Sequence, residues 1–190
     1  MRVPTFFLLP FAFLLLTGCR QAAAPVSVSN KPVSVNNIPQ KDAQQPPSKP
    51  LTEMYWAKFD GPTQKLKELQ GKAVILDFWA TYCPPCIEEI PHLKELQKKY
   101  GKENLEIIGL HVGGDEDRPK VPAFSEKLKI DYPLATPEDA LVSFIFAGDT
   151  AIPQTAIFDR KGNLVKKIVG FDANIKKELD AAVEQAVNGQ

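Results

Sequence analysis

Hydrophobic residues from about Tyr55 to the C-terminus form short apolar runs that alternate with stretches of helical period. Two runs, residues 73–80 and 105–112, are nearly continuous, as is typical of central strands covered on both faces. Between them, apolar residues recur every three or four positions from Ile87 to Tyr100, which predicts a helix. Strand, helix and strand at this spacing predict a βαβ unit with parallel strands and a right-handed crossover.

The C-terminal third continues the α/β pattern. Residues 154–159 and 163–170 are apolar runs joined by a turn that contains Gly162, which predicts an antiparallel hairpin. Apolar residues at intervals of four predict a last helix over residues 173–187. We expect two more helices, over residues 120–128 and 138–146, with the extended stretch "YPLA" between them.

The N-terminus has a different pattern. A single Arg precedes an apolar run over residues 6–16, which is too short to span a bilayer and is typical of an export signal. The run ends in Leu-Thr-Gly-Cys, which is similar to a bacterial lipobox, and this resemblance implies that Cys19 is acylated. The alternative is an ordinary secretory signal that contains a cysteine. Export would place the protein where disulfides persist.

The composition indicates a flexible tether near the N-terminus and shows no net charge that would attract nucleic acid. Residues 20–50 contain six of the 17 prolines and show no helical or strand period, so we interpret them as a flexible tether. The remaining length suits one domain. The 23 basic and 23 acidic residues balance, and no overall field attracts nucleic acid. We therefore expect no nucleic-acid partner.

Two cysteines, Cys83 and Cys86, lie where the predicted helix begins. At positions i and i+3 of a first turn they share one face and can close a disulfide. The start of a helix also presents unpaired N–H groups and a positive dipole end, and both lower the pKa of a thiol. A structural disulfide here would close a very short loop and stabilise the fold little.

A metal site is a weaker interpretation of the pair. Zinc needs three or four protein ligands, and only His92 and His111 remain as imidazole donors. We expect His92 on the helix surface and His111 at the end of a strand, where it could approach the cysteines. The acidic run over residues 113–120 lacks calcium-loop spacing and predicts a solvated turn. We therefore expect redox exchange, with no metal and no cofactor beyond the Cys83–Cys86 disulfide.

The stretch "KELQGKAVILDFWATYCPPCIEEIPHL" resembles the active-site region of the thioredoxin superfamily, and in detail the membrane-anchored TlpA/ResA-type thiol-disulfide oxidoreductases. The similarity runs from about residue 55 to the C-terminus and includes "AIPQTAIFD". It implies a thioredoxin fold over residues 51–190, a central mixed sheet flanked by helices. It also implies an exposed attacking Cys83, a buried resolving Cys86, and a cis bond between Ile152 and Pro153 that lets a substrate strand approach.

Two carboxylates are candidates for proton transfer or tuning. Asp77 lies within an apolar strand six residues before Cys83, where burial should raise its pKa. It matches the buried acid of thioredoxin, whereas the TlpA/ResA type commonly has Asn there, and an aspartate hydrogen-bonded at the sheet edge is the alternative. Glu89 matches a family position and could tune the cysteines, or it could be a solvated helix residue.

The residues around the pair indicate a direction of transfer. Pro84 and Pro85 have no N–H to donate to a Cys83 thiolate, and strong oxidants depend on such stabilisation of their reduced form. This favours a reductant or a mild exchanger. Trp79 should shield the pair. Tyr82 stands where the family usually has Trp and should contact the substrate.

The resemblance implies a monomeric thiol-disulfide reductase of the bacterial envelope. Residues 1–18 would be removed as a signal peptide, and residues 19–50 would form a tether whose acylated Cys19 anchors the protein to the membrane. Its partners would be exported proteins with disulfides, such as apocytochrome c, and a membrane thiol electron donor. Two alternatives stay open. One is a thiol peroxidase, which would not need the second cysteine, and the other is a copper-binding assembly factor that uses the thiols and His111.

Overall fold

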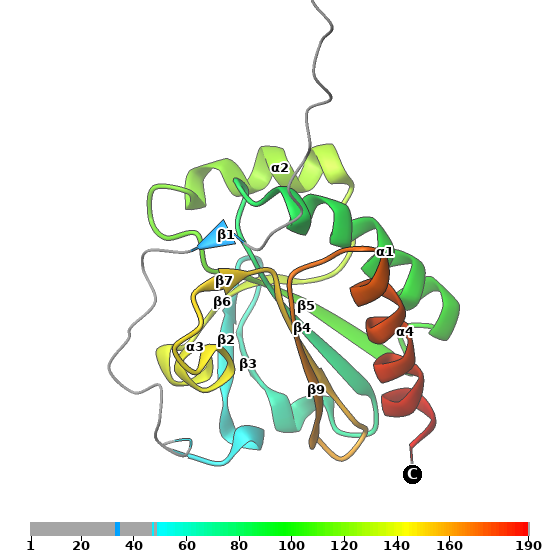
Figure 1. Cartoon of the computed structure of the whole chain (residues 1–190). Helices are drawn as coiled ribbons and strands as arrows, with labels where there is room; N and C mark the ends of the chain where they lie inside the picture. Colours follow the sequence, from blue (N-terminus) through cyan, green and yellow to red (C-terminus); the bar gives the residue numbers. More distant parts are fainter. Residues whose placement is uncertain (1–32, 35–46, 48, 190) are drawn as a thin grey trace, which may run out of the picture.

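Seven strands form the central sheet of the computed structural model, which describes residues 33–34, 47 and 49–189. Their order across the sheet is β3-β2-β6-β5-β4-β8-β9 (Figure 1). The strands are β2 (Tyr55–Lys58), β3 (Thr63–Lys65), β4 (Ala73–Trp79), β5 (Leu105–His111), β6 (Leu134–Pro137), β8 (Gln154–Phe158) and β9 (Leu164–Val169).

The centre of the sheet is mixed. β4 is paired parallel to β5 on one side and antiparallel to β8 on the other, and β8 continues antiparallel into β9. All seven residues of β4 are buried, as its continuous apolar run predicts. The parallel βαβ unit and the C-terminal hairpin are therefore confirmed. The β2–β3 hairpin was not predicted. β2 is only four residues long, and Trp56 is its one buried residue, so it shows no clear apolar pattern.

Four α-helices cover the sheet: α1 (Pro84–Tyr100), α2 (Val121–Leu128), α3 (Asp139–Phe146) and α4 (Ala173–Asn188). Short 3₁₀ turns occur at η1 (Leu51–Glu53), η2 (Leu66–Leu69) and η3 (Arg118–Lys120). α1 and α4 bury their apolar residues in one cluster on one face of the sheet, and α3 contributes to the cluster on the opposite face (Figure 1). All four predicted helices are confirmed: α2, α3 and α4 each differ from the prediction by one residue at one end, and α1 begins at Pro84, three residues before the apolar period starts at Ile87.

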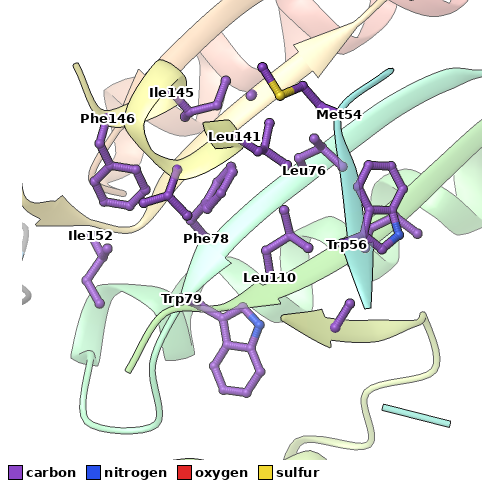
Figure 2. Packing of buried hydrophobic residues seen from close by; sticks show 14 of the residues in the cluster. Met54, Trp56, Leu76, Phe78, Trp79, Leu110, Leu141, Ile145, Phe146 and Ile152 are labelled. Carbon is purple, nitrogen blue, oxygen red and sulfur yellow. The ribbon is translucent and has the colours of Figure 1, made fainter. Parts of the chain in front are cut away.

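The cluster on the α3 face extends toward the cysteines. Phe78 of β4 meets Phe146 of α3 edge to face, with ring centroids 5.4 Å apart, and Ile152 belongs to the same cluster (Figure 2). Cys83 and Cys86 are also members of it. The helix that carries the cysteines is thus held against a packed core.

A second, two-stranded sheet pairs β1 (Val33–Ser34) with β7 (Ala151–Ile152). β1 lies within residues 20–50, whose sequence predicts a flexible tether, and its two residues pair with the edge of β7. Two residues are too few to show a strand period, so this pairing could not be predicted from the sequence.

The export signal, the lipobox and Cys19 lie outside the described residues. Within the described ranges, none of the helices is long and apolar enough to cross a membrane.

Candidate functional site

The two cysteines form a disulfide at the N-terminus of α1. Their sulfurs are 2.03 Å apart and their Cα atoms 5.3 Å apart. Cys83 is the N-cap of the helix, and its sulfur accepts a hydrogen bond from the Cys86 N–H at 3.2 Å. Pro84 and Pro85 occupy the first two helical positions, which suit proline because the first N–H groups of a helix have no partner within it. The sequence therefore begins the helix directly after Cys83.

The exposure of Cys83 differs from the expectation. The family resemblance implies an exposed attacking thiol, but with the disulfide closed Cys83 is 0% exposed and Cys86 is 1% exposed. Around this buried pair, large apolar side chains reach the surface at Tyr82, which is 44% exposed, and Ile87, which is 38% exposed. The closed disulfide is therefore buried next to a surface that presents apolar side chains.

The Ile152–Pro153 peptide bond is cis, as expected. In the β4–β8 register Phe78 is opposite Gln154, so Pro153 and Ile152 continue past the carboxyl end of β4. The chain leaves β4 at the same end and reaches Cys83 within four residues of Trp79. The cis peptide and the disulfide thus share one edge of the sheet.

Asp77 lies in the middle of β4 and is 1% exposed. Neither of its carboxylate oxygens has a hydrogen-bond partner among the described residues. Burial raises the pKa of Asp77 well above its ordinary value, and the nearby Glu89 carboxylate raises it further. This carboxyl is therefore suited to hold a proton near neutral pH.

Glu89 is also buried, so the alternative of a solvated helix residue is wrong. One oxygen, Oε1, accepts a hydrogen bond from Thr155 Oγ1 at 2.6 Å, and Oε2 has no partner in the described chain. Burial raises the pKa of Glu89 to about 7, although the hydrogen bond from Thr155 opposes the rise. Thr155 is opposite Asp77 in the β4–β8 register, which brings the two carboxyls to the same residue from different elements.

Two further polar groups are buried in this part of the fold, and one of them, Tyr132, is not among the site residues predicted from the sequence. Tyr132 is 5% exposed and its hydroxyl has no partner among the described residues, and the same is true of Trp79 Nε1. Both side chains lie over Gly109: a Cβ there would be 3.0 Å from Trp79 Nε1 and 3.1 Å from Tyr132 Cε2. Gly109 is opposite Asp77 in the β4–β5 register. Burial, and then the charges of Asp77 and Glu89, raise the pKa of Tyr132 well above its ordinary value.

A buried carboxylate fastens the segment just before Cys83. Asp117 is 2% exposed and accepts hydrogen bonds from the Thr81 N–H at 2.8 Å and, over a short distance, from the Thr81 hydroxyl. His111 Nε2 lies 3.0 Å from Asp117 Oδ2. Burial acts to raise the pKa of Asp117, but hydrogen bonds from Thr81, His111 and Lys120 outweigh it and hold that pKa below its ordinary value.

The prediction of a solvated turn over residues 113–120 is wrong at Asp117. Asp115 and Glu116 are exposed as expected, whereas Asp117 is turned inward. His111 is also accounted for: burial lowers its pKa against the opposing effect of Asp117, and its ring packs edge-on to Trp79 at 5.4 Å. No local sequence signal distinguished Asp117 from its two acidic neighbours.

His92 is 7% exposed rather than on the surface. Its Nε2 lies 2.7 Å from Asp180 Oδ1 of α4, so the covering helix buries it. Within the described part of the chain, no group of three or more His, Cys, Asp or Glu residues could hold a metal ion.

Comparisons with known proteins identify the family of this chain. The Redoxin family model matches residues 46–183. Over 127 residues the chain is 31% identical to the thiol-disulfide oxidoreductase ResA of Bacillus cereus and 33% identical to that of Bacillus anthracis, and each alignment covers 67% of this chain and 70% of the relative.

Solved structures give the same assignment of fold. A thiol:disulfide interchange protein of the thioredoxin family from Chlorobium tepidum is 28% identical with a TM-score of 0.59, covering 74% of this chain and 99% of that one. DsbF of Mycobacterium tuberculosis, 24% identical with a TM-score of 0.57, covers 72% of this chain and 96% of its own. The chain therefore belongs to the redoxin family of the thioredoxin superfamily and is a thiol-disulfide oxidoreductase of the TlpA/ResA type.

Proposed function

We propose that this oxidoreductase reduces disulfide bonds in proteins exported to the bacterial cell envelope, with Cys83 and Cys86 as its redox pair. The observation that carries the proposal is the closed disulfide at the N-terminus of α1 beside the cis Ile152–Pro153 bond. Relatives that bear the name thiol-disulfide oxidoreductase ResA support the reaction type.

The reaction consists of two thiol-disulfide exchanges. In the reduced enzyme the Cys83 thiolate attacks one sulfur of a substrate disulfide, which breaks the substrate S–S bond, forms a mixed disulfide and releases a substrate thiolate. The Cys86 thiol then loses its proton and attacks the Cys83 sulfur. This second step releases the other substrate thiol and leaves the enzyme oxidised, so two electrons pass to the substrate.

Asp77 is the base that we propose for the Cys86 proton. It is buried, and neither oxygen has a hydrogen-bond partner within the described chain. Both oxygens are therefore free to accept the proton that Cys86 releases. A raised pKa brings a carboxyl toward the range in which it can exchange protons near pH 7. Glu89, whose pKa is raised to about 7, is near enough to raise the pKa of Asp77 and can share that proton with it.

The prolines support the reducing direction. Pro84 and Pro85 remove two of the N–H groups that would otherwise face the Cys83 sulfur, and the Cys86 N–H at 3.2 Å is the backbone donor that remains. A Cys83 thiolate held by fewer donors is stabilised less. The reduced enzyme therefore gives up its electrons more readily than a strongly oxidising relative would.

Protein substrates would bind beside the disulfide. Ile152 and Pro153 supply the backbone edge for an extended substrate segment. Tyr82 and Ile87 provide exposed apolar contact next to Cys83, and Trp79 would shield the cysteine pair.

The N-terminal organisation remains part of the proposal. Residues 1–18 would be a lipoprotein signal peptide, residues 19–50 a tether whose acylated Cys19 anchors the protein to the membrane, and residues 51–190 a monomeric domain on the extracytoplasmic side. A membrane thiol donor would return electrons to the disulfide, which serves as the redox centre without a cofactor. Apocytochrome c before haem attachment is a suitable substrate because its two haem-binding thiols must be reduced.

Trapping of mixed disulfides tests the proposed function. In Cys86→Ala the first exchange should proceed and the second should stop, so envelope proteins should accumulate on Cys83, whereas the matched Cys83→Ala variant should trap none. The reduction potential provides an independent measurement. A potential as oxidising as about −120 mV, or tight copper binding that is lost on replacing His111, would contradict the reductase.

A further inference from the structure

A short strand from the N-terminal segment lies on the edge that carries the cis-proline. β1 pairs antiparallel with β7, with Val33 opposite Ile152 and Ser34 opposite Ala151 (Figure 1). This pair forms its own two-stranded sheet, separate from the central one. The segment thus reaches the domain at the residue directly before Pro153.

The backbone of β7 has one residue suited to such pairing. The Ala151 N–H donates to Asp149 Oδ1 at 2.9 Å, and the Ala151 carbonyl accepts from Gln154 Nε2 at 3.1 Å. Pro153 has no N–H, and its carbonyl accepts from the Gly170 N–H at 2.8 Å. Ile152 is therefore the residue whose N–H and carbonyl can both bond to a neighbouring strand, as alternate residues of an antiparallel pair do.

Ile152 also belongs to the site. It shares a buried cluster with Cys83 and Cys86, and Ile152 and Cys83 are both 0% exposed. An edge strand accepts one neighbour on its open side. A substrate strand therefore cannot pair with Ile152 while β1 does.

We propose that Val33–Ser34 of the N-terminal segment occupy the edge on which an extended protein substrate must bind, so that the segment and the substrate compete for Ile152. The inference rests on the proposed function, because it takes β7 as the substrate-binding edge. The occupant acts as an internal competitor, and small disulfides that reach Cys83 without strand pairing escape it.

The strength of this competition follows from the connection. A segment on the same chain has an effective concentration of up to about millimolar, which favours docking in the absence of substrate. The paired length is two residues, so the docked state is weak enough for a longer substrate strand to displace it.

The test uses the full-length protein with Val33→Pro, which removes the N–H that faces Ile152. Ser34→Pro is the matched control, because in an antiparallel strand the neighbouring N–H points away from β7. One measurement is amide hydrogen exchange at Ile152. The others are the KM for oxidised insulin and the rate with the small disulfide 5,5′-dithiobis(2-nitrobenzoate).

We expect protection of the Ile152 amide in the wild type and in Ser34→Pro, and loss of that protection in Val33→Pro. The KM of Val33→Pro for insulin should fall about threefold to tenfold, which corresponds to a docked fraction of about 65–90% in the wild type. Its rate with the small disulfide should be unchanged.

An unprotected Ile152 amide in the wild type, or equal insulin KM values in wild type and Val33→Pro, would overturn the inference and leave the reductase standing. If the wild type reduces no disulfide, the proposed function fails together with the competition, and the exchange measurement alone decides whether the segment docks on β7.

Discussion

Replacing Glu89 with glutamine should remove much of the loss of stability that the wild type undergoes between acidic and slightly basic pH. Glu89 is 1% exposed, and Thr155 Oγ1 donates to its Oε1 at 2.6 Å. Glutamine has the same shape and can still accept that hydrogen bond. The substitution therefore removes the titration and keeps the packing.

The magnitude follows from the pKa. Burial raises the pKa of Glu89 from its ordinary 4.5 to about 7, so the folded state binds a proton that the unfolded state has already released between those values. The stability contributed by protonated Glu89 is fully present below about pH 4.5 and is lost as the pH rises through about 7. A pKa change of this size corresponds to about 3 kcal/mol of unfolding free energy.

The assay is urea denaturation of the oxidised protein at pH 4 and pH 8. The wild type should lose about 3 kcal/mol more than Glu89→Gln between the two pH values. Because each protein is compared with itself, the constant cost of the buried amide cancels. The matched control is Glu88→Gln, which changes an exposed carboxylate on the same turn of α1 and should behave like the wild type.

Equal losses in wild type and Glu89→Gln would refute the reasoning, because they would mean that Glu89 is ionised at acidic pH in the fold. If Glu88→Gln lost as little stability as Glu89→Gln, the reasoning would be refuted as well, because the effect would not be specific to Glu89.

Three more predictions follow from neighbouring contacts. Asp77→Asn should slow disulfide reduction at pH 7 by about tenfold or more, since it removes the proposed base, while the Cys83 pKa, followed by thiolate absorbance, changes less. Tyr132→Phe should leave the unfolding free energy unchanged or raise it by about 1 kcal/mol, because the buried hydroxyl has no partner in the described residues. Gly113→Ala should lower it by about 1–3 kcal/mol, since a Cβ would overlap Asp117 Oδ2 and lie 2.8 Å from His111 Nε2. Its control is Gly61→Ala, where the nearest atom is 3.5 Å away.

Each of these has a clear contrary result. Unchanged reduction rates from pH 6 to pH 9 would remove Asp77 from the mechanism. A loss of more than about 1 kcal/mol in Tyr132→Phe would mean that its hydroxyl has a bonded partner, such as a buried water. Equal unfolding free energies for the two glycine variants would mean that the loop around Asp117 adjusts without cost.

Elements with a strong local period could be predicted from the amino-acid pattern, and with them the position of the two cysteines at the start of a helix. β4 and β5 could be predicted because strands that are buried on both faces are nearly continuous apolar runs. α1 could be predicted because a helix that is buried on one face repeats its apolar residues every three or four positions. A helix that starts directly after Cys83 brings the two sulfurs together whatever the rest of the chain does. The type of reaction could therefore be predicted from the sequence without knowledge of the fold.

The polar groups that surround the cysteine pair depend on which distant elements pack together. Glu89 meets Thr155 across 66 residues, and Thr81 meets Asp117 across 36, so no spacing in the chain could single out Asp117 from its acidic neighbours. Packing likewise buried Cys83 and placed Val33–Ser34 on β7. Periodicity reports which face of an element is apolar, whereas the partner of a buried charge depends on which distant element covers it.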